Sequence, residues 1–467
     1  MLFPTLQFLV FFLVVFTVYW SLPRHRWRLI WLVASSCFFY MSWNPWLILL
    51  IFASTSVDYG LALRIQALAS PRVRKGLLTC SIVVNLSILA FFKYTVFALH
   101  TGQALLNWFG VALDPPLVKI ILPLGISFYT FEAISYVVDV YNRKIKAIAR
   151  PHDYALYILF FPHLVAGPIV RSGDFLPQLG RIKHFSWPRL YLGVQLILLG
   201  LIKKAVIADH LAIVVDPVFV HPADYGSRAL WLATLGYAVQ IYCDFSGYSD
   251  MAIGLAHTLG FKLPMNFNLP YFAANIADFW RRWHISLSTW LRDYLYVPLG
   301  GNRHGRWATY RNLMMTMTLG GLWHGASWTF VFWGFYHGLL LALQRACGLP
   351  RRFVGTWTRP LNSAATFLAV CVGWVFFRAQ NFTDALTILS GLVRPRLGLG
   401  LQHYQGLLVC VCLLATFAGH VVGAGSVMRK LEPWLPAPAA GAILALGLVL
   451  YFLLLPPDGQ GFIYFQF

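Results

Sequence analysis

Apolar segments long enough to cross a bilayer follow one another along almost the whole chain, separated by short polar loops. A helix that spans the hydrocarbon core needs about 20 predominantly apolar residues. The segments that meet or approach this length are 3–22, 28–42, 46–63, 77–98, 118–140, 188–208, 228–256, 312–323, 325–345, 362–378, 404–424 and 437–455. The pattern predicts an all-α polytopic membrane protein with about 11–13 transmembrane or re-entrant helices.

Two further segments, 153–170 and 270–300, are apolar but interrupted by proline, glycine and charged residues. Irregular backbone is tolerated at membrane depth only where it is buried in protein or lines a cavity. We therefore expect these segments to be broken or re-entrant elements rather than simple spans.

Basic residues gather in alternate loops, which gives the chain an orientation. Those that follow the first, third and fifth spans are Arg24, Arg26, Arg28, Arg64, Arg72, Arg74, Lys75, Arg143, Lys144, Lys146 and Arg150. Cytoplasmic loops carry an excess of Lys and Arg. This predicts a periplasmic N-terminus, although Arg378, Arg394 and Arg396 then fall outside. Segment 3–22 has no basic region before it and is expected to be a retained first helix, not a cleaved signal peptide.

Composition excludes other classes of protein. Of 467 residues, 59% are hydrophobic and 11% are charged, whereas soluble domains are about 25% charged. We therefore expect one integral membrane domain, 1–467.

A net charge of +20 would suggest nucleic-acid binding in a soluble protein, but here the charges lie in loops and no nucleic acid is expected. The seven cysteines are dispersed, which indicates neither a disulfide framework nor a metal site.

Ionisable residues within membrane segments are costly and are by default functional candidates. His324 is the sharpest, because it stands between two apolar runs with Gly320, Gly321 and Gly325 around it. A neutral imidazole can accept a proton from a hydroxyl near neutral pH. The competing interpretation is a buried histidine that hydrogen-bonds a neighbouring helix.

A second cluster, 279–294, alternates arginines and tryptophans around a histidine. Arg281, Arg282 and Trp283 suit an anionic donor such as a nucleotide-bearing thioester, and His284 adds a possible base. An interfacial helix with basic anchors and an aromatic belt explains the arginines equally well. It explains His284 less well, because anchoring does not require a histidine.

Two carboxylates, Asp244 and Asp250, lie in a third apolar run with Gly247 between them, and the glycine suggests a break in the helix. They could orient a histidine or pair with arginines, and structural ion pairs are the favoured role. Weaker candidates are Glu132, His163 and His337, while Lys203 and Lys204 are expected to pair or to snorkel. Walker, GxSxG, zinc and dinucleotide motifs do not stand out, which argues against an ATP-driven pump and a serine hydrolase.

Several of these runs occur together in a known order. They are 123–129 (PLGISFY), 161–168 (FPHLVAGP), 244–252 (DFSGYSDMA), 266–267 (NF), 279–284 (FWRRWH), 299–303 (LGGNR) and 322–325 (LWHG). This set resembles the membrane-bound O-acyltransferase family, most closely its bacterial alginate O-acetyltransferase-like branch. The likeness is densest over a catalytic core at 121–345, between N-terminal helices at 1–120 and C-terminal helices at 346–467.

The resemblance implies helices in a ring around a central tunnel. It implies that His324 is catalytic and His284 the second functional histidine. Trp323, Asn302 and Arg303 join Arg281, Arg282, Trp283, Asp244 and Asp250 as candidate substrate- or donor-binding residues. The donor would be acetyl-CoA, with no bound cofactor and no metal.

For the biological role, the resemblance implies a multi-pass protein of the bacterial inner membrane, in contact with membrane lipids. It would pass acetyl groups outwards to a periplasmic O-acetyltransferase with a serine nucleophile. Together with a polysaccharide synthesis and secretion complex, it would serve O-acetylation of an exopolysaccharide of biofilms, alginate or cellulose.

Other interpretations stay open from the sequence. They are D-alanyl-type transfer from a carrier protein, a polymer or acyl transporter without thioester chemistry, and a structural subunit of a secretion complex. Direct transfer and a relay are both open, as are a general-base histidine and an acyl-histidine intermediate.

Overall fold

The computed structural model describes the chain except residues 2, 112–119, 166, 349–357, 425–436 and 455–467. The described residues form helices and no β-strand, apart from one isolated bridge between Tyr225 and Leu399. They group into two compact units. One comprises Met1–Val194 with Ala252–Pro264, and the other Gln195–Met251 with Met265–Phe467.

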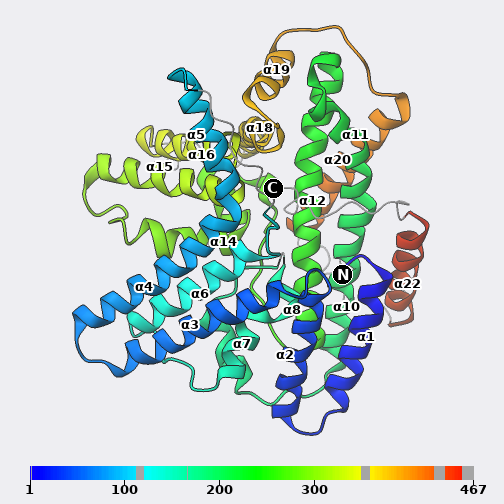
Figure 1. Ribbon diagram of the computed structural model, residues 1–467. Coiled ribbons are helices and arrows are strands. Elements are labelled where there is room, and N and C mark those ends of the chain that lie inside the picture. Colours follow the sequence, from blue (N-terminus) through cyan, green and yellow to red (C-terminus); the bar gives the residue numbers. More distant parts are fainter. Residues whose placement is uncertain (2, 112–119, 166, 349–357, 425–436, 455–467) are drawn as a thin grey trace. The chain divides into compact units, whose positions relative to one another are not determined.

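The first unit contains the N-terminal helices (Figure 1). They are α1 (Leu6–Ser21), α2 (His25–Met41), α3 (Leu47–Ala67), α4 (Pro71–Leu89), a π-helical turn (Ala90–Tyr94), α5 (Thr95–Trp108), α6 (Ile126–Tyr141), α7 (Pro151–Leu159), α8 (Phe161–Leu164) and α9 (Ser172–Leu179). Helices α3, α4 and α6 pack on one another. Between α3 and α4 the buried Asp58 carboxylate accepts hydrogen bonds from Ser81 Oγ at 2.6 Å and Asn85 Nδ2 at 2.8 Å. These bonds offset the cost of burying the carboxylate.

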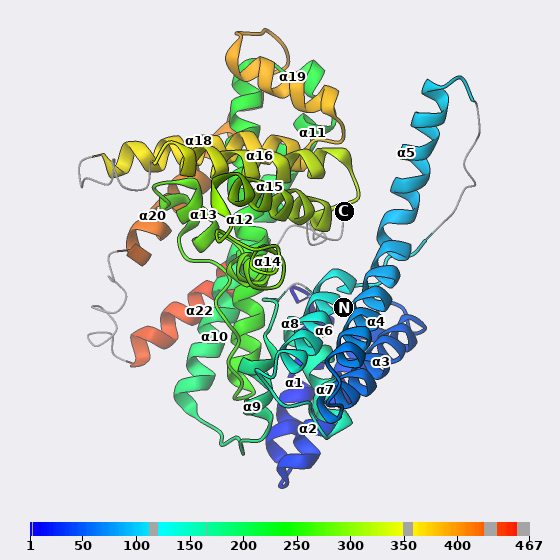
Figure 2. The same ribbon diagram turned by 90° about the vertical axis from the view of Figure 1, so that its left-hand side faces the viewer.

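The remaining helices run on from there. They are α10 (Trp187–Leu201), a π-helical segment (Ile202–Ala208), α11 (Asp209–Val220), α12 (Ser227–Thr258), α13 (Ile276–Arg282), α14 (Ile285–Leu291), α15 (Gly305–His324), α16 (Trp328–Ala346), α18 (Arg359–Arg378), α19 (Phe382–Val393), α20 (His403–Ala424) and α22 (Ala437–Leu453). Helices α15, α16 and α18 lie side by side in the second unit (Figure 2).

Tryptophans form the centre of the second unit. Trp283, Trp333 and Trp374 are each 1% exposed. The Trp374 ring lies 4.8 Å from that of Trp283 and stacks on that of Trp333 at 6.0 Å. Such large rings bury much apolar surface and restrict how the surrounding helices can pack.

The described residues include five helical stretches that are long and apolar enough to cross a membrane. They are Leu47–Ala67, Pro71–Trp108, Trp187–Val220, Arg359–Arg378 and His403–Ala424. Together with the helical content, they confirm the predicted all-α polytopic membrane protein. Each predicted span overlaps a helix or consecutive helical segments, as for 77–98, which runs from α4 into α5. The start of 118–140 and the end of 437–455 lie outside the described residues, and α6 begins at Ile126 after Gly125.

The predicted break at Gly247 is wrong, because α12 runs through it without interruption. A Cβ on Gly247 would lie 2.7 Å from the backbone oxygen of Gly200, and one on Gly200 would lie 2.4 Å from the oxygen of Gly247. The two glycines therefore allow α10 and α12 to approach at backbone distance. The glycine signals close packing rather than a turn.

Both irregular segments are broken, as the sequence predicts. The first holds the short helices α7 and α8, which meet at Phe160. The second is a succession of short pieces: a 3-10 turn (Pro270–Phe272), α13, α14 and a π-helical turn (Arg292–Tyr296). The second segment carries one of the two candidate catalytic histidines.

Candidate active site

His324 is the last residue of α15 and is 3% exposed. The chain turns extended at Gly325, where a Cβ would lie 2.2 Å from the Phe330 ring, so no larger residue fits there without movement. Aromatic rings surround the imidazole, with centroids of Trp323 and Trp333 at 5.0 Å and of Phe377 at 5.4 Å. The histidine is thus held in an apolar, water-poor environment.

His284 lies at the junction of α13 and α14 and is fully buried. Its backbone is left-handed, with φ at 43°, a conformation that non-glycine residues rarely adopt and that clusters at functional sites. Its Nδ1 lies 3.1 Å from Asn266 Oδ1. Since an amide oxygen only accepts, Nδ1 donates, and the ring lone pair of the neutral tautomer is on Nε2.

The two histidines that the sequence singled out come together. Their ring centroids lie 6.2 Å apart at 61°, and the Trp323 ring lies 6.2 Å from that of His284. With hydrogen bonds of about 3 Å, two imidazoles at this spacing can both reach one small polar group. The arrangement can remove a proton from a hydroxyl and hold the developing charge nearby.

Asn266 holds His284 in place; it belongs to one of the sequence motifs but is not among the residues that the sequence singles out. Its Oδ1 accepts from His284 Nδ1, from Ser286 Oγ at 2.9 Å and from Ser286 N at 3.3 Å. Its Nδ2 donates to Ser249 Oγ at 3.2 Å, and its backbone oxygen accepts from Ile285 N at 2.9 Å. One buried side chain thereby fixes the strained turn at His284.

Replacing Asn266 by leucine should remove the acceptor for His284 and lower the rate of acyl transfer by about tenfold or more, the effect of one lost hydrogen bond in a buried network. Asn266→Asp keeps an acceptor at the same position and should retain more activity than Asn266→Leu. The test compares initial rates per folded molecule. Equal activity in wild type and both variants would contradict the role.

The other candidate residues occupy different surroundings. Trp283 is buried against Trp374 and Phe267, with centroids at 4.8 and 5.0 Å. Arg281 is exposed, and Arg282 pairs with Asp278 at 3.0 Å within the same helix. Asn302 and Arg303 lie exposed in the turn before α15. Of the candidate donor-binding residues, Trp323 is the one whose ring the structure shows beside both histidines. The part of the other candidates in donor binding stays a prediction.

Asp244 and Asp250 form ion pairs, the role that the sequence favoured. The cations that the structure shows beside them are lysines: Lys204 Nζ lies 2.5 Å from Asp244, and Lys203 Nζ lies 2.6 Å from Asp250. Lys204 also pairs with Asp209 at 2.7 Å and is almost fully buried with both carboxylates. The next residue, Phe245, packs edge-on against His284 at 4.6 Å. The ion pairs therefore support the helix that carries one wall of the site.

Lys204→Met should lower the stability of the folded protein by about 3–5 kcal/mol, because it leaves two buried carboxylates without their cation. Lys203→Met should cost less, since Lys203 and Asp250 are each about one-fifth exposed. Thermal unfolding of the two variants in detergent tests this order. A larger loss for Lys203→Met would show that burial does not set the cost.

Two weaker candidates meet in the first unit. His163 Nδ1 lies 3.3 Å from Glu132 Oε1, with both side chains buried, and that oxygen also accepts from Val170 N at 2.8 Å.

His337 is fully buried among aromatic rings, stacking on Phe279 at 6.2 Å, as expected of a core histidine. No group of His, Cys, Asp and Glu within the described residues has the geometry of a metal site.

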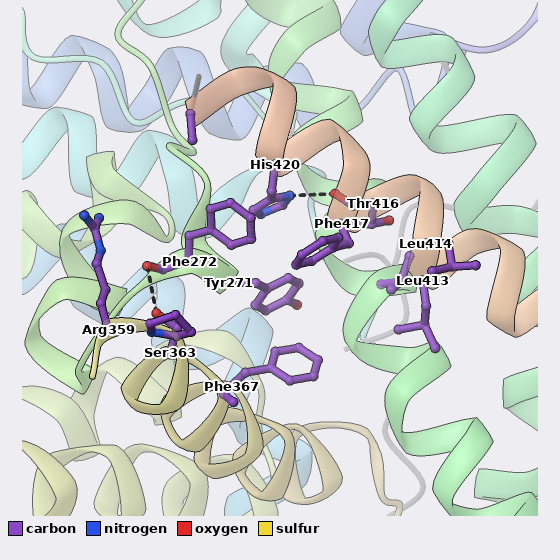
Figure 3. A pocket seen from close by; sticks show the side chains of 14 residues that line it. Tyr271, Phe272, Arg359, Ser363, Phe367, Leu413, Leu414, Thr416, Phe417 and His420 are labelled. Atoms are coloured by element: carbon purple, nitrogen blue, oxygen red, sulfur yellow. Dashed lines mark hydrogen bonds between the residues drawn. The ribbon is translucent and has the colours of Figure 1, made fainter. Parts of the chain in front are cut away.

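An apolar cavity of about 690 Å³ lies in the second unit beside α18 and α20 (Figure 3). His420, whose Nδ1 lies 2.9 Å from the Thr416 carbonyl oxygen, stands over Tyr271 and Phe272 on its wall. The residues that line it do not include His284 or His324. The histidine pair is therefore identified by its own geometry and not by this cavity.

Comparison with known proteins identifies the family of the chain. Residues 130–382 match the family model of the membrane-bound O-acyltransferases. The chain is 44% identical over 398 residues to a probable alginate O-acetylase of Pseudomonas putida, covering 84% of this chain and 80% of that one. It is 42% identical over 435 residues to the Pseudomonas aeruginosa protein of the same name, covering 90% and 81%.

A peptidoglycan O-acetyltransferase of Helicobacter pylori is 39% identical over 391 residues, covering 78% of this chain and 73% of that one. The family model spans more than half of the chain, and the relatives match over most of their own length. The chain therefore belongs to the membrane-bound O-acyltransferase family and is an O-acyltransferase.

Proposed function

We propose that this protein takes an acetyl group from cytoplasmic acetyl-CoA and passes it across the bacterial inner membrane for O-acetylation of a secreted polysaccharide, alginate or cellulose. The observation that carries the proposal is the buried His284–His324 pair, with His284 anchored by Asn266. The names of the relatives, alginate O-acetylase and peptidoglycan O-acetyltransferase, support an acetyl group and a polysaccharide.

In the proposed chemistry, His324 acts as general base on an acceptor hydroxyl. The hydroxyl oxygen attacks the thioester carbonyl carbon as the imidazole takes its proton. The C–S bond then breaks, the acetyl ester is formed, and the coenzyme A thiolate leaves and takes up a proton. The rings of Trp323, Trp333 and Phe377 exclude water around His324, so the charges that develop are weakly screened. The lone pair on His284 Nε2 can accept a hydrogen bond within this site.

The acceptor in this proposal is the serine hydroxyl of a periplasmic transferase, which modifies the polysaccharide in a second step. The N-terminus is periplasmic and the arginines near His284 face the cytoplasm, where an anionic donor arrives. Arg281 is exposed and able to meet such an anion.

The test uses purified protein in vesicles with radiolabelled acetyl-CoA, and follows both free thiol and labelled product. Release of thiol that depends on the acceptor supports the proposal. If acetyl-CoA is not cleaved even with polysaccharide and a periplasmic transferase present, the donor is instead a carrier protein, as in D-alanyl transfer. Movement of label across the membrane with the thioester intact would indicate a transporter.

A further inference from the structure

A polar cavity of about 730 Å³ lies within the first unit, and the residues that line it include neither His284 nor His324. It is formed by α9, the loop that follows it, the start of α10, the end of α12 and the stretch after α12. The charged and imidazole side chains on its wall are Asp174, Arg181, Lys183, His184, Arg189, His257 and Lys262.

Positive charge dominates this wall. Four cations, Arg181, Lys183, Arg189 and Lys262, face a cavity whose lining includes a single carboxylate, Asp174. Like charges held together in this way repel one another and raise the energy of the unliganded protein. An anion bound among them would remove that repulsion.

Lys183 is the least solvated of the four, with 7% of its surface exposed. Its Nζ lies 4.7 Å from the centre of the Phe261 ring, and no carboxylate partner is found for it among the described residues. Burial, with Arg189 and Arg181 close by, lowers the pKa of Lys183 to about 8. Keeping Lys183 charged in this buried, positively charged environment costs free energy, and an anionic ligand would offset that cost.

Hydrogen bonds between side chains and the backbone hold the wall in place. Arg28 Nη1 donates to the Lys183 carbonyl oxygen at 2.8 Å, and Arg189 Nη1 to that of Gly260 at 3.3 Å. The Gln178 side chain donates to the Lys262 carbonyl oxygen and accepts from its N–H, both at 2.9 Å. The cations are thus carried on a preorganised backbone, which lowers the entropic cost of binding.

The cavity lies where a membrane span begins. Trp187, 73% exposed, opens the apolar stretch Trp187–Val220, and Ile182, 67% exposed, precedes it in the loop. Exposed tryptophan next to basic residues is typical of the headgroup level of a bilayer. Arg28, which bonds Lys183, follows the first span and belongs to the loops expected on the cytoplasmic side.

We propose that this cavity is a binding site for a phosphate-bearing anion, with Lys183 as its central cation and Arg181, Arg189 and Lys262 around it. Phosphate accepts charge-assisted hydrogen bonds from Arg and Lys and carries the charge that the site lacks. The phosphate is either that of an anionic lipid headgroup or that of a soluble phosphate compound. The inference does not depend on the proposed acetyl transfer.

The experiment uses the full chain in phosphatidylcholine nanodiscs. One arm titrates inorganic pyrophosphate by calorimetry, and the other adds phosphatidylglycerol and counts retained lipid by native mass spectrometry. We expect one of the two probes to bind, with affinity at least about tenfold lower in Lys183→Gln, which loses a charge-assisted contact. Binding of pyrophosphate identifies a soluble source, and binding of phosphatidylglycerol alone identifies a headgroup.

Lys75→Gln is the matched control, because it removes one positive charge from an exposed position on α4 of the same unit. It should bind the probe as wild type does. Lys262→Gln, at an exposed position of the cavity wall, provides a second test if Lys183→Gln does not fold. Absence of binding by both probes, or equal loss in Lys75→Gln and the cavity variants, would overturn the proposal.

Discussion

His324→Ala is expected to reduce acetyl transfer by about 10²–10⁴-fold, the contribution of a positioned general base. The reason is the geometry at the end of α15, where the buried imidazole lies 6.2 Å from His284 and within rings of Trp323 and Trp333. The measurement is transfer of label from radiolabelled acetyl-CoA by protein that elutes as one monodisperse species. Without the base, binding of the donor should persist while the chemical step is lost.

His403→Ala is the matched control, because His403 is an exposed histidine at the start of α20. It should transfer acetyl groups at the wild-type rate. If His324→Ala instead lowers the amount of folded protein in proportion to the activity, His324 is a structural histidine and the general-base proposal fails. A variant that folds and still transfers at the wild-type rate would also contradict it.

Gly321→Ala is expected to lower both stability and activity, since it acts on the helix that carries His324. A Cβ at this position would lie 2.2 Å from the Phe330 carbonyl oxygen and 2.9 Å from the Gly334 Cα of α16. Backbone cannot yield there without moving α15 against α16, which pack along their length (Figure 2). Overpacking of this kind costs about 1–3 kcal/mol, and it would displace His324, which lies three residues further on.

The control is Gly419→Ala on α20, an exposed helical glycine around which a Cβ would meet no atom within 4 Å. It should leave Tm unchanged or raise it slightly, because alanine is the better helix former by about 1 kcal/mol. Thermal unfolding in detergent, with activity measured on the same samples, separates the two outcomes. If both variants behave like wild type, the close contact of α15 and α16 does not limit stability.

The helices are predictable because each membrane span has to form its backbone hydrogen bonds within itself and present apolar side chains to lipid. Hydropathy therefore marks α3, α18 and α20 without any tertiary information. Amphipathic α19 and the short α9 were not anticipated, since neither is long enough to span a membrane. The break predicted at Gly247 is wrong because the sequence does not distinguish a glycine that ends a helix from one that lets two helices pack closely.

For the site, the sequence marks His284 and His324 as costly residues in apolar surroundings, and the family resemblance implies their roles. Their meeting within one site could not be read from positions forty residues apart. Asn266 escaped notice because a single asparagine in an irregular stretch has no periodic or charge signature. Its importance comes entirely from the donors that converge on its side-chain oxygen.

The sequence by itself determined that this is a helical membrane protein of a known acyltransferase family, with two histidines as its chemical candidates. Those features depend on composition, hydrophobic period and the order of motifs, which are local properties of the chain. Only the tertiary structure decided which cation neutralises Asp244, what anchors His284 and where uncompensated charge gathers around Lys183. Pairing, burial and electrostatic repulsion are properties of distances between residues far apart in the chain, and folding alone sets those distances.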